Sequence, residues 1–338
     1  MPRKRSIMAA ALAGTLVLAG LAACGSDGDG ALVVYSGRTE NLIDPLLDDF
    51  EQETGIDVDR RYDDSANLAL LIEEEGDRTP ADVLISQSPG AVGYLAQAGG
   101  LATLPDEVVD AVPEEDAADD GTWVGLSGRV RTLVYNTGMV EDADLPASVL
   151  DLTAPEYAGR VAVAPTNGSF QDFVTVLRSE LGDDETLAWL EGMAGNDAPT
   201  FDNNTSIVEA VGRGEVPMGL VNHYYALRAL DADADLPVAN HFFPAGDLGS
   251  TVLVTAASII EGTDSQDEAG QLVEFLLSPD AQRYFSDETF EYPLATGAEP
   301  NDALPPVEEI TTTRVDLDEL GGGLARTAEL IDESGLNR

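Results

Sequence analysis

Three short apolar segments alternate with two amphipathic segments near the start of the chain. Residues 31–37 (ALVVYSG), 56–62 (IDVDRRY) and 81–87 (ADVLISQ) have the length and composition of strands. The segments between them, 41–55 and 67–76, repeat apolar residues at helical spacing, and each ends on a glycine. Because a β-α-β-α-β order with short connections is typical of a parallel sheet covered by helices, we expect an α/β fold.

The rest of the chain continues this mixed pattern without an internal repeat or a Pro-rich linker. Residues 121–138 predict extended segments that cross between regions, 159–181 a strand, a loop and a helix, and 205–221 a helix followed by a buried strand. A strand at 250–260, a pair of helices at 267–287 and a last helix complete the pattern. The lack of a linker favours two lobes interleaved in the sequence over two consecutive domains.

The first 30 residues predict a targeting segment. A positively charged start is followed by an apolar run over 7–20 that is too short to span a membrane, which is typical of a secretory signal peptide. The sequence LAAC ending at Cys24 resembles the bacterial lipobox, in which the cysteine is lipidated and begins the mature chain; a free thiol is the alternative. Cys24 is the only cysteine, so an internal disulfide is excluded. We expect a signal peptide over 1–23, a flexible tether over 24–30 and a lipid anchor at the outer face of the cell membrane.

Acidic residues greatly outnumber basic ones. The chain has 63 Asp and Glu against 17 Lys and Arg, and its formal net charge is −46. Such a surface repels nucleic acid and anionic lipid. Because the acidic residues are spread along the chain, we favour solvation in saline or alkaline surroundings over the capture of cations as their role.

The motifs of several enzyme classes are missing. The sequence contains no Gly-x-Ser-x-Gly elbow, no phosphate-binding P-loop and no His-Glu-x-x-His motif. Its two histidines, His223 and His241, are too few and too unpatterned for a zinc site. We therefore do not expect an enzyme.

Tyr224 and Tyr225 lie side by side between a predicted strand and a predicted helix. In the first turn of a helix, neighbouring side chains are only about 100° apart, so both phenol oxygens can reach one pocket. The alternative is that each ring packs in the core with its hydroxyl bonded to the backbone.

Several segments in order carry a family resemblance. VVYSGR, EEEGDRTPADVLISQ, WVGLSGRVRTLVYN, VAPTNGSFQ, NNTSIVEAVGRGEVPMGLVNHYY and EYPLATG together resemble the ferric-iron-binding proteins of bacterial iron ABC transporters, from about Leu32 to the last helix. The resemblance implies a type II periplasmic-binding-protein fold, with two α/β lobes joined by a hinge around a ligand cleft. It places lobe 1 over 31–127 and 252–300, and lobe 2 over 128–251 and 301–338.

The resemblance also implies a metal site. Tyr224 and Tyr225 would be iron ligands, because Fe³⁺ is a hard cation that prefers anionic oxygen and can displace the proton of a phenol. In the family, a loop between a strand and a helix binds a phosphate or carbonate ion that also ligates the iron. The matching anion-binding residues here are Asn167, Gly168, Ser169 and Asn204.

Structural alternatives exist at some of these positions. Asn167 and Ser169 suit helix N-capping, which is compatible with anion binding. Arg38 is expected either to bind the same anion or to form a surface salt bridge. A structural role is expected for at least one of Arg129 and Arg131.

Two positions depart from the family. Thr39 stands where well-known members carry a histidine, and Gln87 stands where they carry a glutamate. Neither residue is a good ligand for Fe³⁺. The remaining coordination would have to come from the anion, from water or from a carboxylate such as Glu40.

The resemblance thus predicts a lipid-anchored, monomeric binding protein that captures ferric iron with phosphate or carbonate and delivers it to an ABC permease. One alternative is the same fold binding an anionic solute, such as a phosphonate, without metal. The other is a cell-surface interaction lipoprotein with no small ligand.

Overall fold

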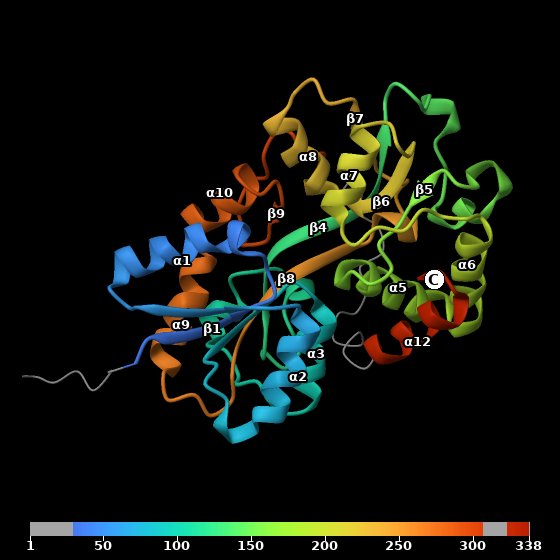
Figure 1. Ribbon diagram of the computed structural model, residues 1–338. Coiled ribbons are helices and arrows are strands. Elements are labelled where there is room, and N and C mark those ends of the chain that lie inside the picture. The colour runs from blue at the N-terminus through green and yellow to red at the C-terminus, as the bar shows by residue number, and fades with distance from the viewer. Residues whose placement is uncertain (1–29, 307–322, 338) are drawn as a thin grey trace, which may run out of the picture. The chain divides into compact units, whose positions relative to one another are not determined.

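A parallel β-α-β-α-β unit opens the fold, as the alternating segments predicted (Figure 1). In the computed structural model, the first strand pairs in parallel with both the second and the third. The elements of this part are β1 (Leu32–Ser36), α1 (Glu40–Thr54), β2 (Val58–Tyr62), α2 (Ser65–Glu75), β3 (Val83–Ser86), α3 (Pro89–Gln97) and α4 (Asp106–Val109).

The structure describes residues 30–306 and 323–337. The predicted signal peptide, the lipidation site Cys24 and the tether up to residue 29 lie outside these residues. Within the described ranges, none of the helices is both long enough and apolar enough to cross a membrane.

The long strand β4 (Val124–Asn136) belongs to both regions of the sheet. Its first half pairs antiparallel with β8 (Val252–Ile259), and its second half pairs with β6 (Met218–Asn222) and β7 (Val238–His241). The strand order in the described residues is β2-β1-β3-β8-β4-β6-β5, with β7 and β9 as additional partners of β4. The extended segment predicted at 121–138 is therefore confirmed, and it links the two sheet regions.

Helices cover both faces of each sheet region. Around the first region, α1, α9 and α10 pack on one face and α2 and α3 on the other. Around the second, α5, α6 and α12 share one core with Leu133, whereas α7 and α8 share another with its neighbour Val134, because successive strand residues face opposite sides. The remaining elements are β5 (Val161–Ala162), α5 (Gly168–Leu181), α6 (Asp183–Gly195), α7 (Asn204–Gly212), α8 (His223–Ala232), α9 (Gln266–Leu276), α10 (Pro279–Asp287), β9 (Tyr292–Pro293) and α12 (Leu324–Ser334).

Two layered α/β regions joined by crossing strands are the arrangement that the predicted fold class requires (Figure 1). The described residues from Ala31 onward form one compact unit. The residue boundaries that we assign to the two lobes within it stay predictions.

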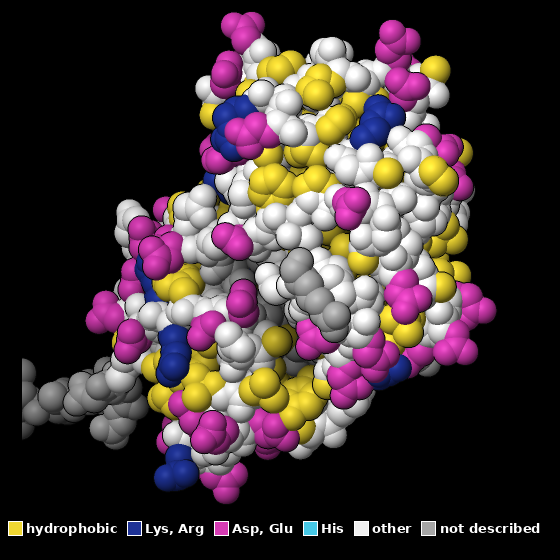
Figure 2. All heavy atoms as spheres, turned by 45° about the vertical axis from the view of Figure 1, so that its right-hand side comes forward, with side chains coloured by type: hydrophobic (Ala, Val, Ile, Leu, Met, Phe, Trp, Pro, Cys, Tyr) yellow, Lys and Arg dark blue, Asp and Glu magenta, His cyan; other side chains and the backbone are white. Residues whose placement is uncertain are grey.

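Carboxylates are distributed over the visible surface in Figure 2, and basic side chains are few. One basic group can form ion pairs with several acids, as Arg60 does with Asp44, Asp48 and Glu51. The scattered distribution agrees with the expectation that the acidic residues solvate the surface.

Candidate functional site

The two adjacent tyrosines lie at a strand-to-helix corner. Strand β6 ends at Asn222 and α8 begins at His223, so Tyr224 and Tyr225 occupy the first turn of the helix. Their rings stack, with centroids 4.3 Å apart and an interplanar angle of 28°. The predicted corner is confirmed, and the two rings lie together, which the first turn of a helix allows.

The two phenols differ in environment. Tyr224 is fully buried, whereas Tyr225 is half-buried and lines the cleft. The phenol oxygen of Tyr224 accepts a hydrogen bond from Nε2 of Gln87 at 3.0 Å. Burial, together with the neighbouring Tyr225 and Glu291, raises the pKa of Tyr224 well above its usual value. The phenol therefore stays neutral until a strong cation displaces its proton.

His223 fixes the start of α8 against the crossing strand β4. Its Nδ1 accepts a hydrogen bond from the backbone N–H of Val130 at 3.1 Å, so Nε2 carries the proton and donates to the carbonyl of Phe290 at 2.7 Å. Burial lowers the pKa of His223 to about 4, which keeps the ring neutral. His223 therefore holds the tyrosine pair in place and is structural.

The loop before α5 is organised around the side chain of Asn167. Its Oδ1 accepts from the backbone N–H of Ser169 at 3.2 Å, from the hydroxyl of Ser169 at 2.7 Å and from Nδ2 of Asn204 at 3.1 Å. The expected N-cap is thus present. With Oδ1 turned inward, Nδ2 of Asn167 has no acceptor among the described residues. The N–H of Gly168 opens the helix, where no intrahelical acceptor exists.

The side chain of Asn204 connects this loop to the end of β6. Asn204 also donates to the hydroxyl of Ser169 at 3.1 Å, and its Oδ1 accepts from the backbone N–H of Asn222 at 3.3 Å. The Nδ2 atom of Asn222 is buried and has no partner in the described part of the chain. A buried amide donor without an acceptor is costly, so a water molecule or an anion that accepts from it would stabilise this position.

Arg131 is a buried cation beneath the same loop. It donates to the backbone carbonyl of Ser169 and, at 3.3 Å, to Oδ1 of Asn204. No carboxylate of the described residues forms an ion pair with it. Burial and the nearby Arg129 lower the pKa of Arg131 to about 10, so the group still carries its charge at neutral pH. An unpaired buried cation favours an anion close by.

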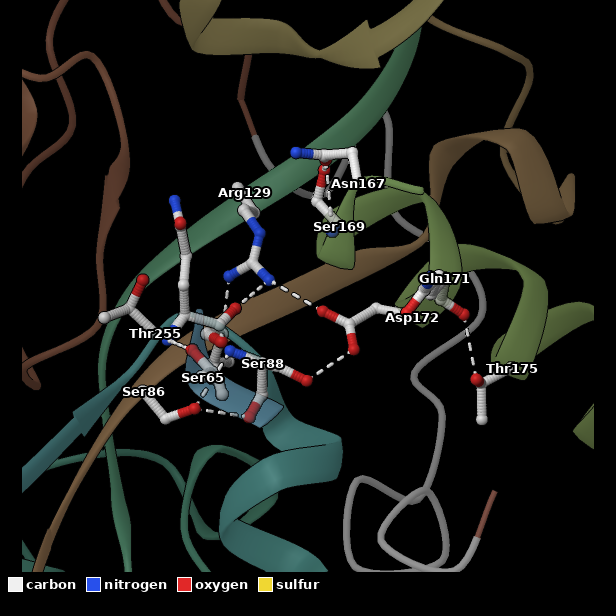
Figure 3. Close-up of polar contacts among 12 residues, drawn as sticks. Ser65, Ser86, Ser88, Arg129, Asn167, Ser169, Gln171, Asp172, Thr175 and Thr255 are labelled. Atoms are coloured by element: carbon white, nitrogen blue, oxygen red, sulfur yellow. Dashed lines mark hydrogen bonds and ion pairs between the residues drawn. The ribbon is translucent and has the colours of Figure 1, made fainter. Parts of the chain in front are cut away.

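Arg129 has a structural role, as we expected for one of the two arginines. It forms an ion pair with Asp172 at 3.3 Å and donates to the backbone carbonyls of Val254 and Gln87. Asp172 also accepts from the hydroxyl of Ser88 at 2.5 Å (Figure 3). These contacts connect α5 with the end of β3 across the cleft.

Arg38 forms a salt bridge, but the bridge is buried and not at the surface. Its guanidinium contacts both carboxylate oxygens of Glu291, at 2.5 and 3.0 Å, and the hydroxyl of Thr255 at 2.9 Å. The alternative prediction of a salt bridge at the surface is therefore wrong, because the salt bridge is buried. Glu291 already neutralises Arg38, but Arg38 also lines a hollow of the cleft, so anion binding by this residue stays a prediction.

Tyr225 and the loop face one polar cleft, with Tyr224 buried directly behind Tyr225. Two adjoining hollows, with volumes of about 240 and 800 Å³, share Gly37, Asp64, Gln87, Asn167 and Tyr225 in their walls. Thr39 lines the larger hollow, whereas Glu40 lines neither. The carboxylates in the walls are Asp63, Asp64, Asp172 and Glu209.

The described residues contain no cluster of three or more His, Cys, Asp and Glu side chains suited to a metal ion. A metal in this cleft would therefore depend on phenol oxygens. The sequence pointed to the tyrosines and the loop as a candidate site, but not to Asn222 or to the lack of an ion pair at Arg131. Only the position of Asn222 directly before the tyrosine corner could have drawn attention to it.

A polar cleft between two α/β regions joined by crossing strands defines a binding protein of the type II periplasmic class. The family model for bacterial extracellular solute-binding proteins matches residues 78–320, and the chain belongs to this family.

Individual relatives have more specific names. The chain is 29% identical to the Fe(3+)-binding periplasmic protein of Serratia marcescens, over 97% of this chain and 96% of the relative. It is 31% identical to the major ferric iron-binding protein of Neisseria meningitidis, over 84% and 87%. The crystal structure of iron-bound HitA from Pseudomonas aeruginosa superposes with a TM-score of 0.86 at 32% identity, covering 90% of this chain and 99% of that one. The predicted fold class and the resemblance to ferric-iron-binding proteins are confirmed.

Proposed function

We propose that the chain binds ferric iron through Tyr224 and Tyr225, together with a phosphate or carbonate ion held at Asn167, Gly168 and Ser169. The iron is then delivered to the permease of an ABC transporter. The observation that carries this proposal is the stacked pair of phenols, in which Tyr225 lines the polar cleft and Tyr224 is buried against it.

The chemistry of the phenols favours a trivalent cation. Phenolate is a hard anionic oxygen ligand, which Fe³⁺ prefers. Because the pKa of Tyr224 is raised by burial, only a cation of high charge can displace its proton. A site for an uncharged or purely anionic solute gains little from two such phenols.

The groups around the loop favour an anion beside the metal. Nδ2 of Asn167, the N–H of Gly168 and the orphan Nδ2 of Asn222 are donors without acceptors in the described chain. Arg131 adds a buried positive charge that forms no ion pair with a carboxylate of the described residues, although Asp172 acts on it from farther away. Asn204 orients the loop by bonding Asn167 and Ser169. With Thr39 and Gln87 in place of the stronger ligands of the family, the anion would occupy coordination positions that the protein leaves open.

A visible-absorption titration tests the proposal. Ferric ion, supplied as a weak chelate with phosphate or carbonate, is expected to produce a phenolate-to-iron charge-transfer band. Tyr224→Phe and Tyr225→Phe should each remove or shift that band, whereas Tyr135→Phe, in a strand outside the cleft walls, should not. Binding of phosphate or a phosphonate with no band at any iron concentration would instead support a metal-free anion site. Wild-type affinity for iron in the double Phe variant would exclude the tyrosines as ligands.

We also propose that the mature chain is a monomer anchored to the outer face of the cell membrane through lipid on Cys24. The support is the LAAC sequence at the end of the apolar leader. Mass spectrometry of the mature N-terminus should find a lipidated Cys24, and Cys24→Ser should release the protein or leave the leader uncleaved. An unmodified Cys24 with cleavage elsewhere would rule the anchor out.

A further inference from the structure

Gln87 is held tightly where the end of β3 meets the cleft. Its backbone N–H donates to the hydroxyl of Ser65 at 2.9 Å, and its backbone carbonyl accepts from the buried guanidinium of Arg129. Figure 3 shows Arg129 directed toward this strand end on one side and toward Asp172 on the other. Because both backbone groups of Gln87 are hydrogen-bonded, the position of its Cα atom, and so the origin of its side chain, is fixed.

The side-chain amide of Gln87 reaches across the cleft to the buried phenol. Nε2 lies 3.0 Å from the oxygen of Tyr224, a normal hydrogen-bond distance. A neutral phenol can accept from this amide or, if the amide is turned over, donate to its oxygen. A phenolate has no proton and can only accept. Loss of the phenol proton therefore selects the orientation in which Gln87 donates.

We propose that Gln87 is a positioning residue for the metal site: its amide donates a hydrogen bond to the Tyr224 phenolate from outside the coordination sphere of the iron. This inference rests on the proposed function. Gln87 stands where the family carries a carboxylate ligand. Its amide can donate a hydrogen bond to the phenolate, whereas an ionised carboxylate has no donor.

The hydrogen bond should change the electronic state of the ligand. A donor at the phenolate oxygen withdraws electron density and lowers the energy of the orbital from which charge is transferred to the iron. The charge-transfer band of the wild type should therefore lie at a shorter wavelength than that of a protein without the donor. Partners outside the coordination sphere also orient ligands, and their loss typically costs about 10- to 100-fold in metal affinity.

The test compares iron-loaded wild type with Gln87→Met, which keeps the length of the side chain and removes the donor. Gln87→Leu is measured in parallel, and Gln271→Met on the exposed face of α9 is the matched control. We expect both Gln87 variants to bind iron with a band shifted to longer wavelength and an affinity lower by about 10-fold. The band of the control should coincide with that of the wild type.

Two results would overturn the inference. A Gln87→Met band at the wild-type wavelength would mean that no hydrogen bond reaches the phenolate. Complete loss of iron binding in a folded Gln87→Met protein would mean that Gln87 is itself a ligand. A wild-type protein without any band, with either anion, would instead disprove the proposed function, so the two failures are distinguishable.

Discussion

The guanidinium of Arg38 and the carboxylate of Glu291 form a buried two-point ion pair, although 253 positions separate them in the chain. The pair ties the turn after β1 to the segment between α10 and β9. Burial disfavours the ionised form of Glu291, but Arg38 and Thr289 overcome this effect and hold the pKa of Glu291 below its usual range. The pair is therefore charged and structural.

Breaking this pair on one side should destabilise the fold strongly. Glu291→Ala leaves a buried guanidinium without a counter-charge, and we expect the free energy of unfolding to fall by about 3–5 kcal/mol. The double variant Arg38→Met/Glu291→Leu should recover much of that loss. Asp280→Ala, which breaks the exposed Arg283–Asp280 pair, is the control and should change little. Urea denaturation measures all of them; a Glu291→Ala protein as stable as the control would contradict this account.

Asp172 should make stability depend on pH. Burial raises its pKa to about 6, although Arg129 and Ser88 act in the opposite direction. The folded state thus keeps a proton that the unfolded chain releases near pH 4. The stabilisation from this proton is complete below pH 4 and is lost as the pH rises through about 6. Relative to Asp172→Asn, the wild type should lose about 1–3 kcal/mol between pH 4 and pH 7. If the difference in free energy of unfolding between the two proteins stays constant from pH 4 to pH 7, the carboxyl of Asp172 does not have a raised pKa.

Arg131→Met should weaken the anion half of the site. The change removes a buried positive charge and its hydrogen bonds to Ser169 and Asn204. Since a hydrogen bond to a charged group contributes about 1.5–3 kcal/mol, the dissociation constant for iron in the presence of phosphate should rise about 10- to 100-fold. The fold should survive, because Arg131 has no carboxylate partner to leave behind. Equal iron affinity in Arg131→Met and in the control Arg160→Met would exclude this role.

Gln87→Glu should reduce the dependence of iron binding on added anion. The substitution exchanges the amide beside the Tyr224 oxygen for a carboxylate, an anionic oxygen ligand of the kind that Fe³⁺ prefers. Iron retention against a competing chelator, measured with and without phosphate, should differ less in the variant than in the wild type. An unchanged ratio would indicate that a carboxylate at this position does not reach the metal.

Salt should stabilise the protein whether or not iron is bound. The net charge of −46 makes the folded chain repel itself, and added ions screen that repulsion. The melting temperature is expected to rise between low and molar sodium chloride. A flat or falling melting temperature would contradict the view that the acidic surface is adapted to a saline or alkaline medium.

Local patterns in the sequence determined much of the architecture. The alternation of strand and helix signals predicted the opening β-α-β-α-β unit and many of the later elements, but not α6 or β7. Tyr224 and Tyr225 were expected at a corner between a strand and a helix, and they lie there. Asn167 was expected to cap a helix, and it does. These features depend on backbone propensity, capping and side-chain spacing, which act over a few residues and can be read along the chain.

The tertiary structure alone decided how the charged and amide groups are paired. Arg38 and Glu291 meet across 253 positions, and Gln87 reaches Tyr224 across 137. Arg129 has a carboxylate partner, whereas Arg131, two residues along the same strand, has none among the described residues. The sequence could not distinguish these two arginines, because both lie on the same crossing strand. They differ only in which side chains of other elements lie beside them. Burial determines how much free energy an ionised group costs, and packing determines which group lies next to it. Both depend on segments that are distant in the sequence and meet only in the folded protein.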